Sequence, residues 1–122
     1  MVVATADIDG FTRGSRGRSN VEMFQFLDRF YEIVGDVVSS AGGTVVKFMG
    51  DGALLAFPED RARQAVATLE SLKERVRSLL AEMDPSMSLR IRAHVGPVAC
   101  GPIGPGKRFD VIGKCVSDLA PT

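Results

Sequence analysis

Hydrophobic and polar residues follow two different periods along the chain. Apolar side chains recur every three or four positions in residues 19–41 and again in 60–83, which predicts two amphipathic helices. Residues 2–8 and 45–57 hold short apolar runs typical of strands, and residues 87–95 alternate strictly between apolar and polar side chains. The pattern predicts a strand, a helix, a two-stranded hairpin, a second helix and a further strand.

Residues that favour helix ends stand at the borders of the two helices. Ser19 with Glu22 forms a capping box at the start of the first helix, Gly42-Gly43 is a typical helix end, and Pro85 stops the second helix. We expect the buried helix faces to consist of Phe24, Leu27, Tyr31, Val34, Val38 and Ala41, and of Ala62, Ala65, Val66, Leu69, Leu72, Val76, Leu79 and Leu80. The strand that follows would have one face of Met87, Leu89, Ile91, Ala93 and Val95 and another of Ser88, Arg90, Arg92 and His94.

The order β-α-β-β-α-β is the split βαβ arrangement of ferredoxin-like folds. We therefore expect an α+β domain with an antiparallel sheet and helices on one face, followed by short strands and turns in residues 96–113. In this topology the third strand lies antiparallel beside the first. The end of strand one then meets the start of strand three, so the carboxylates of Asp7 and Asp51 are expected at the same edge of the sheet.

The overall composition argues against several classes of protein. Of the 122 residues, 45% are hydrophobic and 25% charged, which is the balance of a folded domain and not of a disordered chain. Fifteen basic residues balance fifteen acidic ones, so no net charge would recruit nucleic acid or an anionic membrane. No apolar run approaches the roughly 18 residues of a membrane span. We expect a cytoplasmic protein, or the cytoplasmic domain of a larger one, without direct membrane contact.

Two carboxylates at one sheet edge repel each other unless a cation lies between them. Mg²⁺ prefers oxygen ligands and is typically held by one or two carboxylates together with substrate phosphates. The neighbouring stretch "DGFTRGSRGR", residues 9–18, adds glycines, arginines and the start of a helix, all of which favour phosphate. Alternatively, Asp7 and Asp9 are strand-end turn residues and Asp51 is an ordinary hairpin aspartate. Their convergence on one edge favours a metal–phosphate site.

Three blocks of the sequence resemble, in order, the catalytic domain of class III adenylyl and guanylyl cyclases. They are "ADIDGFT" (6–12), "GGTVVKFMGDGALLAF" (42–57) and "RIRAHVGPVACGPIGPGKRFDVIG" (90–113), and together they cover most of the chain. The resemblance implies an enzyme that works as a homodimer, or as a heterodimer with another cyclase domain. It would use two divalent metal ions, Mg²⁺ or Mn²⁺, to convert a nucleoside triphosphate into a 3′,5′-cyclic monophosphate and pyrophosphate.

The resemblance also implies roles for individual residues of the metal and phosphate site. Asp7 and Asp51 would be the two metal-binding aspartates, with the main-chain carbonyl of Ile8 as a further ligand. The loop over the β- and γ-phosphates would consist of Asp9, Gly10, Phe11 and Thr12. In this family the metal aspartates come from one protomer and the purine-reading residues from the other, so a monomer could not turn over.

Lys47 and Asp110 match the family positions that read the purine, and lysine there goes with adenine. Adenine offers N1 as an acceptor and its 6-amino group as a donor, so a lysine–aspartate pair complements it, whereas guanine presents the opposite pattern. The resemblance thus implies ATP as substrate, with GTP disfavoured. Alternatively, Lys47 is a solvent-facing strand lysine and Asp110 a loop aspartate.

The resemblance weakens at the end of the chain. Family members carry an asparagine and, four residues later, an arginine, which orient the ribose and stabilise the transferring phosphate; here these positions are Ser117 and Pro121. We expect residues 1–122 to form a single cyclase-like domain without the family's C-terminal helix and hairpin. Two hypotheses follow: an adenylyl cyclase in which Ser117 weakly replaces the asparagine, or an impaired cyclase domain that binds nucleotide or regulates a partner by dimerisation. The metal aspartates and the purine pair favour the enzyme.

Overall fold

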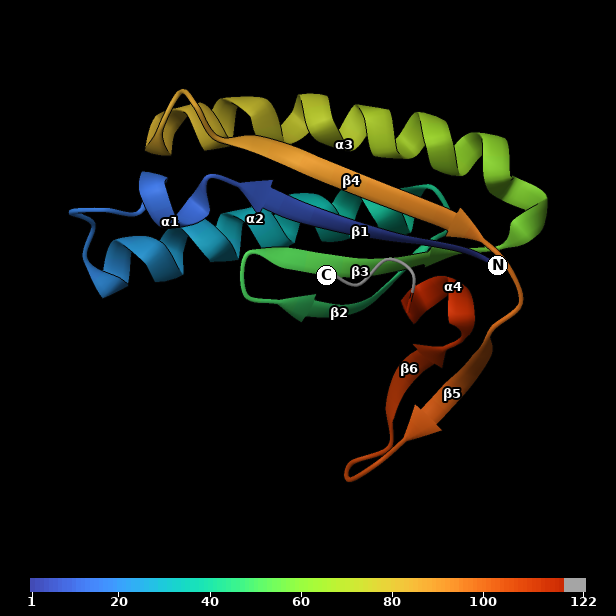
Figure 1. Ribbon diagram of the computed structural model, residues 1–122. Helices are drawn as coiled ribbons and strands as arrows, with labels where there is room; N and C mark the ends of the chain where they lie inside the picture. The colour runs from blue at the N-terminus through green and yellow to red at the C-terminus, as the bar shows by residue number, and fades with distance from the viewer. Residues whose placement is uncertain (118–122) are drawn as a thin grey trace.

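Four antiparallel strands form the central sheet of the protein (Figure 1). The computed structural model describes residues 1–117, except for the side chains of Cys115 and Ser117. The strands are β1 (Val2–Asp9), β2 (Thr44–Met49), β3 (Gly52–Phe57) and β4 (Ser88–Val95), arranged in the order β2-β3-β1-β4. Strand β1 pairs with both β3 and β4, as the ferredoxin-like topology requires. The predicted α+β class and the βαββαβ order are confirmed.

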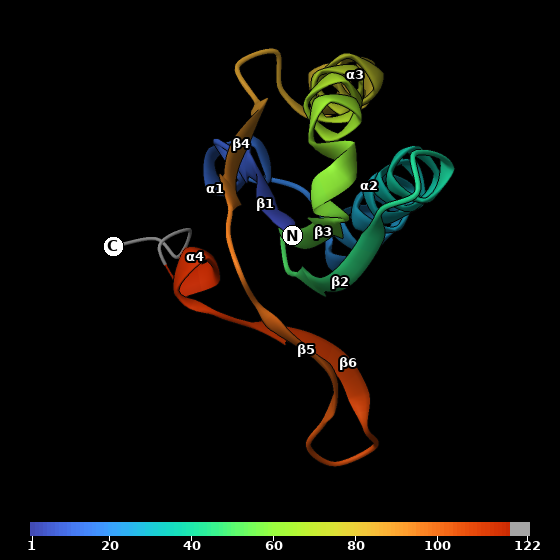
Figure 2. The ribbon, with the colours of Figure 1, turned by 90° about the vertical axis from the view of Figure 1, so that its right-hand side faces the viewer.

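Two long helices cover one face of this sheet, as Figure 2 shows from the side. They are α2 (Asn20–Ser40) and α3 (Ala62–Met83), preceded by the short α1 (Phe11–Gly14) and the 3₁₀ turn η1 (Glu59–Arg61). The capping box of α2 is present: the Glu22 N–H donates to the Ser19 hydroxyl at 3.1 Å, and the Ser19 N–H donates to the Glu22 carboxylate at 3.3 Å. These bonds satisfy N–H groups that the first helical turn leaves without acceptors.

The glycine end of α2 also forms as predicted. Gly42 has a φ of 78°, in the left-handed region that favours glycine, and its N–H donates to the Ser39 carbonyl at 3.1 Å. The N–H of Gly43 donates to the Val38 carbonyl at 3.0 Å, which turns the chain back toward β2. Helix α3 ends at Met83, two residues before Pro85.

The core lies between the two long helices and the sheet face formed by alternate residues of β1 and β3. Its largest fully buried side chains are Phe30, Phe57, Leu55, Leu72, Leu80, Val34, Val38 and Val76. Two predicted members of the helix faces are wrong, because Phe24 is 75% exposed and Val66 is 57% exposed. Each helical residue turns by about 100°, so Phe24 faces away from the stripe that begins at Phe26, and Val66 lies beyond the edge of its own stripe.

The predicted apolar face of β4 is buried only in its first half. Met87 and Leu89 are buried, whereas Ala93 and Val95 are exposed on this edge strand of the sheet. None of the helices within residues 1–117 is long and apolar enough to cross a membrane.

A two-stranded arm extends away from the central sheet on the side opposite α2 and α3 (Figures 1 and 2). It consists of β5 (Ala99–Ile103) and β6 (Arg108–Ile112), and it leads into the short helix α4 (Lys114–Ser117). Val111 packs with Val3 and Ala56 in a small second cluster of buried apolar side chains. This cluster attaches the base of the arm to the sheet face that α2 and α3 leave uncovered.

Candidate functional site

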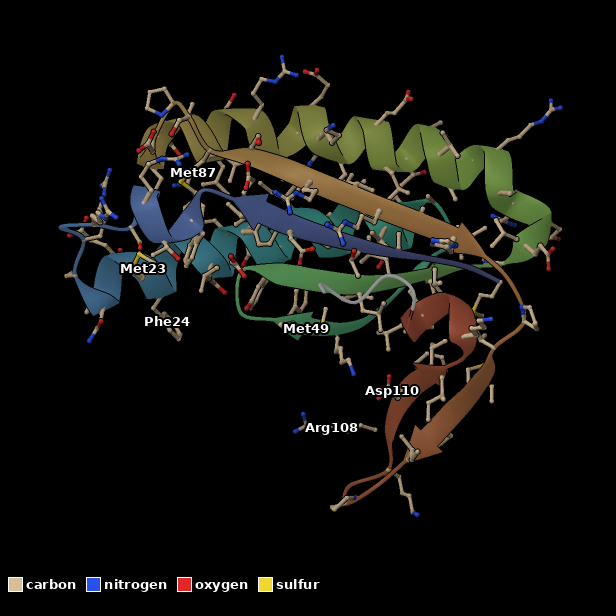
Figure 3. The ribbon with its side chains drawn as sticks, in the orientation of Figure 1. Met23, Phe24, Met49, Met87, Arg108 and Asp110 are labelled. Atoms are coloured by element: carbon tan, nitrogen blue, oxygen red, sulfur yellow. The ribbon has the colours of Figure 1, made fainter. Side chains whose placement is uncertain are left out.

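A pocket of about 550 Å³ lies on the sheet face opposite the long helices, between the sheet and the base of the arm. Its lining residues are Thr5, Asp7, Lys47, Met49, Asp51, Leu54, Asp110, Val111, Ile112, Gly113 and Val116. In Figure 3, Asp110 points from β6 toward β2, the strand that carries Met49. The pocket therefore brings together four residues expected at the metal and purine sites, Asp7, Asp51, Lys47 and Asp110, from three strands and one turn.

Sheet pairing places two of the three aspartates of this pocket, Asp7 and Asp51, next to each other. Asp7 on β1 is in register with Gly52, the residue that follows Asp51 in the turn between β2 and β3. The N–H of Ile8 donates to the main-chain carbonyl of Asp51 at 2.9 Å, which ties this turn to β1. A Cβ atom at Gly52 would overlap Oδ1 of Asp7, so the absence of a side chain at Gly52 leaves room for that carboxylate.

Burial and a neighbouring carboxylate both disfavour the ionised form of Asp7. Burial raises the pKa of Asp7 above its ordinary value, and the nearby carboxylate of Asp51 raises it further. The guanidinium groups of Arg92 and Arg90 act in the opposite direction. A divalent cation beside Asp7 and Asp51 would relieve their repulsion, so this donor set fits a hard metal ion.

The protein itself supplies few ligands for such an ion. Within residues 1–117 no group of three or more histidine, cysteine, aspartate or glutamate side chains is close enough to hold a metal. Ile8 has a hydrocarbon side chain, which is buried on the helix-facing side of the sheet, so the only ligand that this residue could offer is its main-chain carbonyl. Mg²⁺ commonly completes its coordination with water and substrate phosphate oxygens, which suits a site with two carboxylates.

Lys47 and Asp110 form an ion pair across the pocket. The Lys47 Nζ atom donates to Oδ2 of Asp110 at 3.3 Å, and the two side chains are 48% and 27% exposed. Oδ1 of Asp110 accepts the main-chain N–H of Val111 at 2.8 Å. This N–H and, after it, Lys47 hold the pKa of Asp110 below its ordinary value. The pair is partly open to solvent, so a ligand can reach its donors and acceptors.

The predicted phosphate loop begins where β1 ends. Asp9 forms an ion pair with Arg90 of β4 at 3.0 Å, and Gly10 has a φ of 81° that allows the chain to turn into α1. Phe11 packs against the core, with its ring 6.1 Å from that of Phe26, while Thr12 is exposed. The main chain of this loop, rather than the Phe11 side chain, is the part that could contact a phosphate.

Two arginines expected to help bind phosphate are engaged elsewhere. Arg13 donates to the Ser86 hydroxyl at 2.9 Å, and Arg18 donates to the Met83 carbonyl at 2.9 Å, both at the turn between α3 and β4. The expectation that they supply the phosphate site is therefore wrong for the arrangement seen here. Both tie the loop to this turn, and Arg18 does so at the carbonyls of the α3 C-terminus, which attract cations.

A model of the adenylate and guanylate cyclase catalytic domain matches residues 1–120 of this chain. The chain belongs to this family of cyclase catalytic domains. The cyclase domain is 33% identical to an uncharacterized protein of Mycobacterium tuberculosis, over 98% of this chain and 22% of that protein. It is 29% identical to an adenylate cyclase of Anabaena cylindrica, over 96% of this chain and 25% of that protein. The domain thus spans a quarter or less of the length of these curated relatives.

Solved structures of cyclases have the same fold as this cyclase domain. The crystal structure of the guanylyl cyclase Cya2 is 29% identical, with a TM-score of 0.80, over 97% of this chain and 66% of that chain. The catalytic core of a rhodopsin-guanylyl cyclase with converted specificity, in complex with ATPαS, is 25% identical, with a TM-score of 0.85, over 97% of this chain and 67% of that chain. Cyclases of this family generally use divalent metals.

Sequence reasoning about the cyclase domain missed three residues near the site. Thr5 lines the pocket and is 8% exposed, and its hydroxyl has no hydrogen-bond partner within residues 1–117. Arg92 lies opposite Thr5 in the β1–β4 register and acts on the pKa of Asp7. Strand alternation places Thr5 on the same face of β1 as Asp7, and this signal could have pointed to Thr5 and to Arg92 opposite it. The third is Tyr31, whose hydroxyl contacts the turn before Asp51 and was predicted only as part of an apolar face.

The residues at the end of the cyclase domain stay predictions. The main chain of Ser117 ends α4, next to the pocket residue Val116, but its side chain lies outside the described part of the structure. Pro121 also lies outside the described residues. The roles of Ser117 and Pro121 in catalysis therefore rest on the sequence.

Proposed function

We propose that this domain is an adenylyl cyclase that converts ATP into 3′,5′-cyclic AMP and pyrophosphate. Membership of the cyclase family supports nucleotide cyclisation, and members of the family act on ATP or on GTP. The observation that carries the choice of ATP is the Lys47–Asp110 pair, which lines the same pocket as Asp7 and Asp51. In the dimer that the family resemblance implies, the pair of one protomer would read the base of a nucleotide whose phosphates lie at Asp7 and Asp51 of the other protomer.

Hydrogen-bond chemistry favours adenine at this pair. The Lys47 ammonium can only donate and suits adenine N1, and the ionised Asp110 carboxylate can only accept and suits the adenine 6-amino group. Guanine would bring an N–H to the lysine and a carbonyl oxygen to the aspartate, so both contacts would be mismatched. The lowered pKa of Asp110 keeps it ionised and therefore an acceptor at neutral pH.

Asp7, Asp51 and the main-chain carbonyl of Ile8 would hold the divalent cations, Mg²⁺ or Mn²⁺. Bound cations would neutralise phosphate charge and make the ribose 3′-hydroxyl a better nucleophile toward the α-phosphorus. The protein contributes the fixed placement of Asp7 beside Gly52 and the segment of residues 9–12, which ends β1 and begins α1. Arg90 and Arg92 add positive charge near Asp7, which also suits an anionic substrate.

We further propose that the active form is a dimer, with a second copy of this chain or another cyclase domain. Large apolar side chains are exposed around the pocket and along the arm, namely Phe48, Met49, Ile103, Phe109 and Ile112. A cavity of about 480 Å³ between β2 and the arm adjoins Lys47 and Asp110 and contains three of these residues. Exposed apolar patches of this kind mark interaction sites in soluble proteins. A partner at this surface would shield the nucleotide pocket from water.

The test is cyclic nucleotide formation by the full chain at high protein concentration, with Mn²⁺ and either ATP or GTP. Asp51→Ala serves as the control variant because it removes one proposed cation ligand from a half-buried position in the turn. We expect cyclic AMP from ATP, little product from GTP, and none from the variant. Binding of ATP with Mn²⁺ but no product would instead favour the impaired regulatory domain suggested by Ser117 and Pro121. If the chain gives no product and also shows no metal-dependent binding of ATP, the proposed function is refuted.

A further inference from the structure

The two peptide groups that flank Asp51 are both held by hydrogen bonds. On one side, the main-chain carbonyl of Asp51 accepts the N–H of Ile8 at 2.9 Å, from the strand that carries Asp7. On the other side, the carbonyl of Gly50 accepts the hydroxyl of Tyr31 at 2.6 Å, from helix α2 beside the β2–β3 hairpin (Figure 1). Since peptide groups are planar, fixing these two carbonyls fixes the directions in which the chain enters and leaves the Asp51 Cα atom.

The Tyr31 ring is itself held in place. It stacks on the ring of Phe48 in β2, with centroids 4.0 Å apart and planes 22° apart. The backbone of Gly50 is the least restricted part of the turn, with a φ of 58° and no heavy atom within 4 Å of a Cβ position. Without the hydroxyl bond, the plane of the Gly50–Asp51 peptide would have freedom to rotate, and the Asp51 carboxylate would move with it.

We propose that Tyr31 is a positioning residue for the cation site: its hydroxyl holds the Gly50 carbonyl so that the Asp51 carboxylate faces Asp7. This inference rests on the proposed function, because it assigns to Asp51 the role of a cation ligand. Tyr31 does not line the nucleotide pocket, so it acts through the turn and not on the substrate. Gly50 is exposed, and water can replace the hydroxyl at its carbonyl, so removing the bond should affect orientation more than folding.

The test compares divalent cation binding by wild-type protein, Tyr31→Phe, Phe48→Leu and Asp51→Ala. Free Mn²⁺ is measured by electron paramagnetic resonance with a non-cyclisable ATP analogue present, each sample against a matched one without protein because the analogue itself binds Mn²⁺. Thermal unfolding is followed on the same samples. Tyr31→Phe keeps the ring stack and removes only the hydroxyl. Phe48→Leu keeps the hydroxyl and weakens only the stack that holds the ring, so it should lower Mn²⁺ affinity less than Tyr31→Phe does at an equal loss of thermal stability. We expect Tyr31→Phe to weaken Mn²⁺ binding about threefold to tenfold, the effect of losing one hydrogen bond.

A second measurement uses the fact that Tyr31 is the only tyrosine and the chain has no tryptophan. Tyrosine fluorescence therefore reports on this turn alone, and Mg²⁺ should change it in the wild type but not in Asp51→Ala. Equal Mn²⁺ affinities of wild type and Tyr31→Phe would overturn the positioning role and leave the proposed function intact. The positioning role would also be overturned if, in both Tyr31→Phe and Phe48→Leu, the loss of Mn²⁺ affinity were in the same proportion to the loss of thermal stability. Absence of Mn²⁺ binding by the wild type would overturn both proposals.

Discussion

Replacing Lys47 and Asp110 by amides would test their role in base recognition separately from their contribution to folding stability. In the double variant Lys47→Gln/Asp110→Asn the side chains keep similar lengths and lose their charges, and each amide can both donate and accept a hydrogen bond. Either purine could then be paired by rotating the amides. We therefore expect a protein that binds ATP and GTP with similar affinity, where the parent prefers ATP.

The size of each effect follows from the exposure of the pair. An ion pair at 3.3 Å with side chains 48% and 27% exposed contributes about 0.2–1 kcal/mol to folding, so its loss should lower the unfolding midpoint by at most about 5 °C. Two mismatched hydrogen bonds to guanine, at the low end of about 1–3 kcal/mol each because the site is partly open, give about 2 kcal/mol of discrimination. That corresponds to about a thirtyfold preference for ATP, which the double variant should lose.

Calorimetric titration with ATP and with GTP in the presence of Mn²⁺ measures this preference without requiring turnover. The matched control is Arg29→Gln/Glu82→Gln, because Arg29 and Glu82 form an ion pair at 2.9 Å away from the pocket, with 59% and 60% exposure. This control should change stability by a similar small amount and leave the nucleotide preference unchanged. An unchanged preference in the Lys47/Asp110 variant, together with an unfolding free energy lowered by more than about 2 kcal/mol, would refute base recognition and make the pair a support for the arm.

Two further variants test the geometry and the charge of the proposed metal site. Gly52→Ala should weaken Mn²⁺ binding at least about tenfold, because the added Cβ displaces the Asp7 carboxylate. The matched control is Gly35→Ala in the middle of α2, where an added Cβ meets no atom within 4 Å. This control should add about 0.5–1 kcal/mol of stability and leave Mn²⁺ binding unchanged. Asp7→Asn should stabilise the metal-free protein at neutral pH. Because the folded-state pKa of Asp7 is raised, its favourable contribution is present below its ordinary value of 3.8 and is lost as pH rises through the raised pKa. Urea unfolding in EDTA from pH 3 to 8 checks this, and a wild type that gains stability over Asp7→Asn with rising pH would contradict it.

The elements were predictable because each has a strong local signal. The capping box at Ser19, the glycines after residue 41 and the strict alternation after Pro85 depend on short-range chemistry, and all appear in the structure. The meeting of Asp7 with the Asp51 turn was also predictable, since it follows from the antiparallel pairing of β1 and β3. These features require only the order of the elements and the period of the side chains.

Features that depend on side-chain direction were not predictable. Phe24 matches a helical period as well as Phe26 does, and only the packing of α2 on the sheet decides which of the two is buried. Arg13 and Arg18 stand in a glycine-rich loop that suits phosphate, yet nearby acceptors at the end of α3 engage both. Tyr31 was assigned by its ring alone, and the pattern contains no information about where its hydroxyl would point.

The turn Gly50-Asp51-Gly52 has features that hairpin chemistry alone does not require. Gly50 has a φ of 58°, which a tight turn often needs and which favours glycine. Gly52 does not have a positive φ, so turn geometry does not demand glycine there. What excludes a side chain at Gly52 is the Asp7 carboxylate on the neighbouring strand. A hairpin selected only for folding would gain β propensity and apolar burial from almost any other residue at this position. The closeness of the Asp7 carboxylate therefore accounts for the second glycine, which supports the proposal that the turn presents Asp51 beside Asp7.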